Sequence, residues 1–164
     1  SGALGYIHNG EVFYYHAPSC GNECTDYVHK GSLSNESRTP YFNVEGLYSL
    51  PKVGIAYGYS NVQGDVVEMM IKKGYKGIVY AGVGNGNIHK NVFPLLETAR
   101  EDGIVVVRSS RVPTGATTLD AEVDDNKYRF VASWGLNPQK ARILLMLALT
   151  KTDDWKTIQK YFNN

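Results

Sequence analysis

The chain has 164 residues, of which 43% are hydrophobic and 20% charged, enough to bury one core and a small appendage. Its formal net charge is +1 and its basic residues are interspersed with acidic ones, so no basic face attracts nucleic acid or an anionic membrane. The longest apolar run, residues 143–149, is far shorter than the ~20 residues that span a bilayer. We therefore expect neither nucleic acid nor a membrane as a partner.

The first residues predict a β-hairpin. The chain begins Ser1-Gly-Ala-Leu, without a charged and then an apolar segment, so any signal peptide or upstream domain is expected to lie outside it. Apolar and aromatic runs flank Asn9-Gly10, a dipeptide preferred in type I′ turns. We expect residues 1–15 to form a hairpin that belongs to the end of an upstream domain. Residues 16–50 are expected to be a long linker, and residues 51–164 a carboxyl-terminal α/β domain.

The predicted linker holds both cysteines of the chain. The spacing of Cys20 and Cys24 allows a small disulfide in an oxidising compartment. His16 and His29 flank the pair, but these intervals match no common zinc module, so a disulfide is favoured over a metal site. Asn35, in Asn-Glu-Ser, is a candidate glycosylation acceptor if the protein passes through a eukaryotic secretory pathway.

The region from residue 51 alternates short apolar runs with helical patterns. Strands are expected at residues 53–57, 78–80 and 104–107, and the helices between them are expected to end near Gly74 and Gly103. This repetition predicts a small parallel sheet covered by helices, a three-layer α/β fold of the Rossmann or flavodoxin type.

The helix termini carry their own signals. Asn91 is the expected N-cap of the second helix, with Pro94 in its first turn. Asn137-Pro138 predicts the start of a helix that runs to about Thr150, whose apolar residues lie nearly all round it and indicate burial. A last helix presents three apolar residues on one face: Trp155, Ile158 and Phe162. Both of these helices are expected to cover the sheet.

Residues 81–87, Ala-Gly-Val-Gly-Asn-Gly-Asn, follow a predicted strand and precede a helix. Glycines and carboxamides at the carboxyl end of a buried strand let a small ligand approach the backbone, so the segment is expected to be a site. The glycines superficially match a dinucleotide fingerprint, but the spacing is G-x-G-x-G and residues 105–108 lack the ribose-binding acid. The signal for NAD is weak, and a turn that only lets strand and helix pack is an equal alternative.

Two further segments are polar. Residues 108–118 carry hydroxyls suited to a substrate or a neighbouring subunit, but they lack a P-loop lysine, and a loop that satisfies its own backbone is the default. If the next segment were extended, Asp120, Glu122 and Asp124 would share one face and could hold a divalent cation. A solvated acidic turn is commoner, and we expect no metal and no cofactor.

Five segments together resemble the carboxyl-terminal part of the bacterial-type type II L-asparaginases. They are LPKVGI at 50–55, GIV at 77–79, AGVGNGN at 81–87, VVRSSRVPTGATTLDAE at 106–122 and LNPQKAR at 136–142. The resemblance covers residues 3–15 and about 50–164. It implies hydrolysis of L-asparagine to L-aspartate and ammonia, with slower hydrolysis of glutamine, through a threonine acyl-enzyme formed in the amino-terminal domain.

By this resemblance, Asn87 and Glu122 reach into the active site of a neighbouring subunit. An α-ammonium group needs a carboxylate and a carbonyl acceptor, which these side chains provide, and each charge-assisted bond contributes ~1.5 to 3 kcal/mol. The family's nucleophile motif, Thr-Asp dyad and lysine have no counterpart here, and Thr114 to Thr118 lack a neighbouring His or Lys. No catalytic residue is therefore expected on this chain.

These features predict part of an L-asparaginase that acts only with an amino-terminal domain or chain. It is expected to assemble as a homo-oligomer, a dimer of dimers, in the periplasm or as a secreted protein. A non-catalytic amino-acid-binding or regulatory module from the same family is the open alternative. A domain of a tRNA-dependent amidotransferase would need a basic surface, which the balanced charge argues against.

Overall fold

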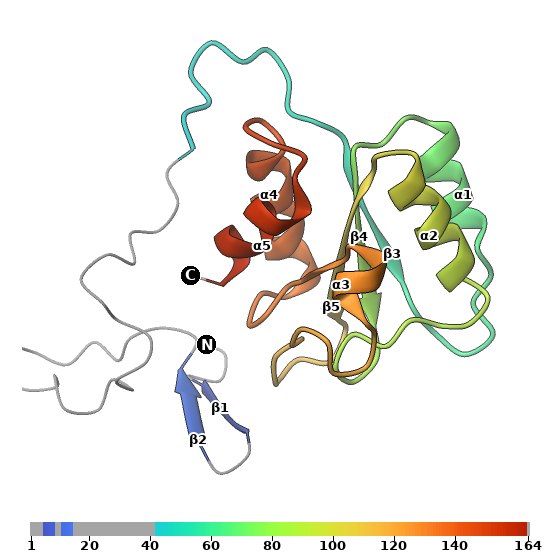
Figure 1. Ribbon diagram of the computed structural model, residues 1–164, viewed down its shortest axis with the longest axis vertical. Helices are drawn as coiled ribbons and strands as arrows, with labels where there is room; N and C mark the ends of the chain where they lie inside the picture. The colour runs from blue at the N-terminus through green and yellow to red at the C-terminus, as the bar shows by residue number, and fades with distance from the viewer. Residues whose placement is uncertain (1–4, 9–10, 15–41, 164) are drawn as a thin grey trace, which may run out of the picture. The chain divides into compact units, whose positions relative to one another are not determined.

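The computed structural model describes residues 5–8, 11–14 and 42–163 of the chain (Figure 1). The residues from Phe42 to Asn163 form one compact unit, and the two short segments belong to another. None of the helices in the described ranges combines the length and the apolar character needed to cross a membrane.

Several predictions concern residues outside these ranges. The disulfide expected between Cys20 and Cys24 lies there, as does the glycosylation acceptor Asn35. These remain predictions from the sequence.

The first two strands form the expected hairpin. Strand β1 (Gly5–His8) pairs antiparallel with β2 (Glu11–Tyr14), and His8 lies opposite Glu11. This register leaves two residues between the strands, as the Asn-Gly signal predicts. The turn residues themselves, Asn9 and Gly10, are outside the described ranges.

A four-stranded parallel sheet forms the centre of the larger unit. Its strands lie in chain order, β3 (Val53–Tyr57), β4 (Gly77–Gly82), β5 (Val105–Ser110) and β6 (Val131–Ala132). All residues of β4 are buried, as expected for an inner strand covered on both faces. Only three strands were predicted, and β6 was missed.

Helices cover both faces of this sheet, which confirms the three-layer prediction (Figure 1). Helices α1 (Asp65–Lys72) and α2 (Phe93–Glu101) lie on one face, and α4 (Pro138–Ala148) and α5 (Trp155–Phe162) on the other. The short α3 (Asp125–Tyr128) precedes β6.

Strand residues alternate between two apolar cores. Ile78 and Val106 pack under α1 and α2 with Leu96, whereas Val79 and Val107 pack on the opposite face. This period of two divides each strand between the layers. The sheet is thereby fixed on both faces, and its carboxyl edge is left to the loops.

One of the two predicted N-caps is correct. The Asn137 side chain accepts a hydrogen bond from the Lys140 backbone N–H at 2.9 Å and caps α4. The prediction for Asn91 is wrong, because α2 begins at Phe93 with Val92 in the cap position. The Asn91 amide instead donates to the Val62 carbonyl at 3.2 Å and joins the loops before α1 and α2. Pro94 lies in the first turn as expected.

The burial expected all round α4 is also corrected. Ala141, Leu145 and Ala148 are fully buried, but Ile143 is 51% exposed. Only one stripe of a helix can face a sheet, so the apolar residues on the other side stay partly accessible in this chain.

Candidate functional site

The polar segments singled out in the sequence leave the sheet at one edge. Residues 83–87 follow β4, and residues 111–124 follow β5. Because the strands are parallel, their carboxyl ends lie at the same edge, which is where open α/β sheets bind ligands.

The loop after β4 folds back on itself, and its glycines are required by packing. The Asn87 N–H donates to the Val83 carbonyl at 2.9 Å, and a Cβ on Gly82 would collide with the Asn87 carbonyl. Gly86 has φ +74°, and a Cβ there would lie 2.6 Å from Thr117 Cγ2. These contacts support the packing interpretation of the glycines over a dinucleotide fingerprint.

Arg108, near the end of β5, joins the polar loops. It is fully buried, and its Nε and Nη2 atoms donate to the two carboxylate oxygens of Asp125 at 2.6 and 2.5 Å. Nη1 donates to the carbonyls of Asn85 and Gly86 at 2.9 and 3.3 Å. Nη2 also donates to the Thr118 carbonyl at 2.9 Å. All five N–H groups of the guanidinium thus have acceptors.

A second pair of hydrogen bonds connects the same loops. The Asn85 side chain donates to Thr118 Oγ1 at 2.8 Å and accepts from the Thr118 N–H at 2.7 Å. The loop after β4 is therefore bound to the loop after β5 through both a side chain and the buried guanidinium.

The acidic segment forms a turn, as favoured from the sequence, and not the extended arrangement that was the alternative. Asp120 has φ +52°, and its carboxylate accepts two hydrogen bonds from Asn126. Asp124 caps α3 through the Lys127 N–H at 2.8 Å. Across the described part of the chain, no group of three metal-binding side chains comes together. Two of the three carboxylates considered for a cation, Asp120 and Asp124, therefore serve the turn and α3.

The two predicted binding residues lie on the loops that Arg108 joins. Asn87 directly follows Gly86, and Glu122 lies in the turn closed by the Asp120 N–H, which donates to Asp125 Oδ2 at 2.9 Å. Asn87 is half-buried and Glu122 exposed. Neither side chain forms a hydrogen bond or ion pair with the described residues.

Sequence reasoning missed the residues that hold these loops. The sequence places Arg108 in the polar segment 108–118 and at the position where a ribose-binding acid is absent, and it assigns no role to Asp125. One signal was available, because an arginine directly after the apolar run of residues 105–107 must be either exposed or paired.

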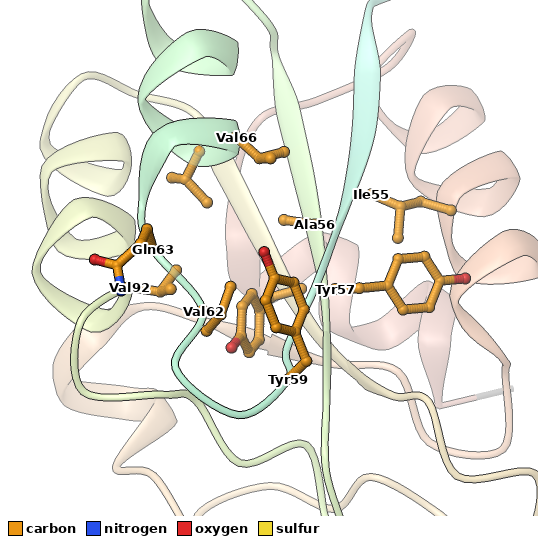
Figure 2. Close-up of a pocket in the computed structure, with 10 residues that line it drawn as sticks. Ile55, Ala56, Tyr57, Tyr59, Val62, Gln63, Val66 and Val92 are labelled. Atoms are coloured by element: carbon orange, nitrogen blue, oxygen red, sulfur yellow. The ribbon is translucent and has the colours of Figure 1, made fainter.

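A separate pocket of about 210 Å³ opens near the end of β3. Figure 2 shows Tyr59, Val62 and Ala56 on one side of this strand, whereas Ile55 and Tyr57 point to the other. The buried Tyr80 hydroxyl accepts a hydrogen bond from the His89 N–H at 3.3 Å, and burial raises the pKa of Tyr80. Asn87 and Glu122 do not line this pocket.

The fold and the loops define a class: a parallel α/β domain with polar loops at the carboxyl edge of its sheet, where such sheets bind ligands. Comparison with known families makes this specific. The Glutaminase/Asparaginase C-terminal domain matches residues 52–162, more than half of the chain, and the chain belongs to this family.

Individual relatives match over nearly the whole chain. It is 55% identical to the probable periplasmic L-asparaginase of Haemophilus influenzae over 99% of its residues, and 54% identical to L-asparaginase 2 of Escherichia coli, also over 99%. It is 39% identical to the glutaminase-asparaginase of Pseudomonas fluorescens over 98%. The chain spans only 43%, 42% and 41% of the length of these three relatives.

Proposed function

We propose that the chain is the carboxyl-terminal part of an L-asparaginase, which hydrolyses L-asparagine to L-aspartate and ammonia. The nucleophile is a threonine outside this chain, in an amino-terminal domain or chain, and forms the acyl-enzyme. The proposal rests on the sequence identity of 54–55% to two relatives named L-asparaginase, over 99% of the chain. A relative named glutaminase-asparaginase supports a glutaminase side activity.

Asn87 and Glu122 bind the substrate's α-ammonium group in this proposal. The Glu122 carboxylate and the Asn87 side-chain oxygen are acceptors for a cationic N–H donor. Both belong to loops at the sheet edge and have no competing partner among the described residues. Because holding the amino acid also places its carboxamide carbon for attack, losing this contact lowers turnover as well as affinity.

The site is shared between chains of a homo-oligomer, a dimer of dimers. The exposure of Glu122 supports this arrangement, since its carboxylate is directed to no group in the described part of its own chain. The protein works in the periplasm or is secreted. The Haemophilus influenzae relative, a probable periplasmic L-asparaginase by name, supports this compartment.

Ammonia release from L-asparagine by the full-length protein tests the proposal. We expect activity, and we expect Glu122→Gln to raise KM and lower kcat, with kcat/KM falling about tenfold or more because a charge-assisted hydrogen bond is lost. Glu68→Gln is the matched control, since Glu68 pairs with Lys72 on the exposed side of α1.

Three outcomes are decisive. Activity that depends on Glu122 supports the proposal. Activity that Glu122→Gln leaves at the level of the control removes Glu122 from the site. If the full-length protein releases no ammonia from asparagine or glutamine yet binds aspartate, the non-catalytic module is the better description.

A further inference from the structure

We infer that Arg108 and Asp125 are positioning residues that set the spacing of Asn87 and Glu122, and through this spacing the recognition of the substrate's α-ammonium group. The inference rests on the proposed function of that site. Neither residue is placed against the substrate; each acts through the loop that carries a binding side chain.

The covalent distance between the two binding residues cannot set their spacing. They are separated by 35 positions in the sequence, with α2 and β5 between them. The register of β4 against β5 fixes where the two loops begin, and contacts that cross between the loops fix the spacing beyond that point. Within the described residues, the Arg108 guanidinium and the Asn85–Thr118 hydrogen bonds provide such contacts.

The guanidinium holds the Asn87 loop by its backbone. Nη1 binds the carbonyls of Asn85 and Gly86, the residues directly before Asn87. Gly86 also has no room for a side chain, because a Cβ there would lie 3.1 Å from Arg108 Nη1. The backbone of Gly86 therefore packs directly against the Arg108 guanidinium, one residue before Asn87.

The Asp125 carboxylate holds the Glu122 turn. Its two oxygens receive Nε and Nη2 of Arg108, and Oδ2 also receives the Asp120 N–H. Glu122 lies between Asp120 and Asp125, and the Asp125 carboxylate holds these two ends of the turn together. Arg108 and Asp125 are both fully buried, so this geometry is shielded from water.

Stabilisation of the fold does not by itself explain why Arg108 and Asp125 are buried as an ion pair. Well-packed apolar residues of similar volume usually stabilise a protein as well as a buried ion pair does. A planar guanidinium with donors in a fixed fork, however, can hold several backbone carbonyls at set positions, which an apolar side chain cannot do. The buried pair is therefore suited to holding the two loops at a fixed distance.

The test uses an analogue without the α-amino group. Succinamic acid has the carboxylate and carboxamide of asparagine but lacks its amino group. We define the amino-group preference as kcat/KM for L-asparagine divided by kcat/KM for succinamic acid. A variant that is merely less stable lowers both values together, whereas a variant that displaces Asn87 or Glu122 lowers the preference.

Asp125→Asn in the full-length protein is the main variant. One carboxylate oxygen becomes an amide that cannot accept from Arg108 or from the Asp120 N–H. We expect the amino-group preference to fall about five- to tenfold, the loss of part of a charge-assisted contact. Asp102→Asn, at the exposed end of α2, is the matched control and is expected to leave the preference unchanged.

A double-mutant cycle shows whether Asp125 acts through Glu122. Glu122→Gln alone is expected to lower the preference about tenfold or more. Adding Asp125→Asn to Glu122→Gln is expected to lower it little further, because the two changes then affect one contact.

The failures of the two proposals differ. If Glu122→Gln lowers the preference but Asp125→Asn leaves it within the range of the Asp102→Asn control, the positioning inference is overturned and the proposed function stands. A full additional effect of Asp125→Asn in the Glu122→Gln protein also overturns the inference. If Glu122→Gln leaves the preference unchanged, the proposed binding role fails, and the inference fails with it.

Arg108→Lys is the second variant if Asp125→Asn does not fold. Lysine keeps the positive charge but lacks the planar fork that binds Asp125 and the loop carbonyls together. We expect a fall in the amino-group preference of about five- to tenfold, as for Asp125→Asn. An unchanged preference in a folded Arg108→Lys protein would contradict the inference.

Discussion

At the scale of single residues, Gly82 and Gly86 show how little freedom the loop after β4 has. A side chain at Gly82 would meet the Asn87 carbonyl, and one at Gly86 would meet Thr117 and Arg108. The glycines therefore serve the approach of one protein segment to another. In the proposed function, the ligand-binding atoms of this loop belong to Asn87, the residue that follows Gly86.

Tyr80 gives a prediction about pH. Burial raises the pKa of its hydroxyl above the ordinary value of 10.0, partly opposed by the hydrogen bond from the His89 N–H. The folded state therefore holds the proton more tightly than the unfolded state. The associated stability is fully present below about pH 10 and is lost as pH rises from there through the pKa of the folded state.

Tyr80→Phe should make the free energy of unfolding fall less steeply above pH 10. It should also cost about 1 kcal/mol at neutral pH, because the His89 N–H loses its acceptor. Denaturant unfolding between pH 7 and 11 measures both effects. Tyr48→Phe, at a fully exposed position, should keep the wild-type slope. Equal slopes for wild type and Tyr80→Phe would contradict the assignment.

At the scale of elements, the cap of α4 is a direct test of local structure. Asn137→Ala removes the acceptor of the Lys140 N–H and should lower the free energy of unfolding by about 1 kcal/mol. Chemical denaturation measures the loss. Lys140→Ala keeps the same backbone N–H and should change the value by less than about 0.5 kcal/mol. Equal effects of the two substitutions would show that the cap contributes nothing.

The elements that could be predicted from the sequence are those with a sustained period. The strand expected at residues 53–57 has the observed bounds of β3, and the helix starting at Asn137-Pro138 was placed correctly. Strand β6 was missed because its two residues are too short for an alternating pattern. Asn91 was misassigned because its carboxamide bonds to Val62, a long-range contact that no local pattern reveals.

The candidate site was predictable only in part, for a similar reason. Asn87 and Glu122 could be named because they lie within segments that resemble a known family. The residues that hold their loops in place could not be predicted. Arg108, Asp125 and Asn85 meet only after the sheet aligns β4 with β5. A buried arginine is paired by residues distant in sequence, so its partners follow from the fold.

At the scale of the whole molecule, the chain spans less than half the length of the L-asparaginase and glutaminase-asparaginase relatives named above. In the proposed function, Asn87 and Glu122 bind the ammonium group, but neither is a nucleophile activated by a neighbouring base. In the proposed function, this chain holds the amino acid, and the threonine of the amino-terminal part attacks it. In an oligomer with shared sites, these two parts come from different subunits.

Subunit complementation shows whether the two parts come from different subunits. One full-length protein carries Glu122→Gln, and a second carries an alanine in place of the nucleophilic threonine of the amino-terminal part. The two are mixed, dissociated and reassembled, and ammonia release from L-asparagine is measured. We predict about one quarter of wild-type activity, because half of randomly paired dimers are mixed and each mixed dimer rebuilds one of its two shared sites. Activity no higher than the average of the two parent proteins would contradict the account.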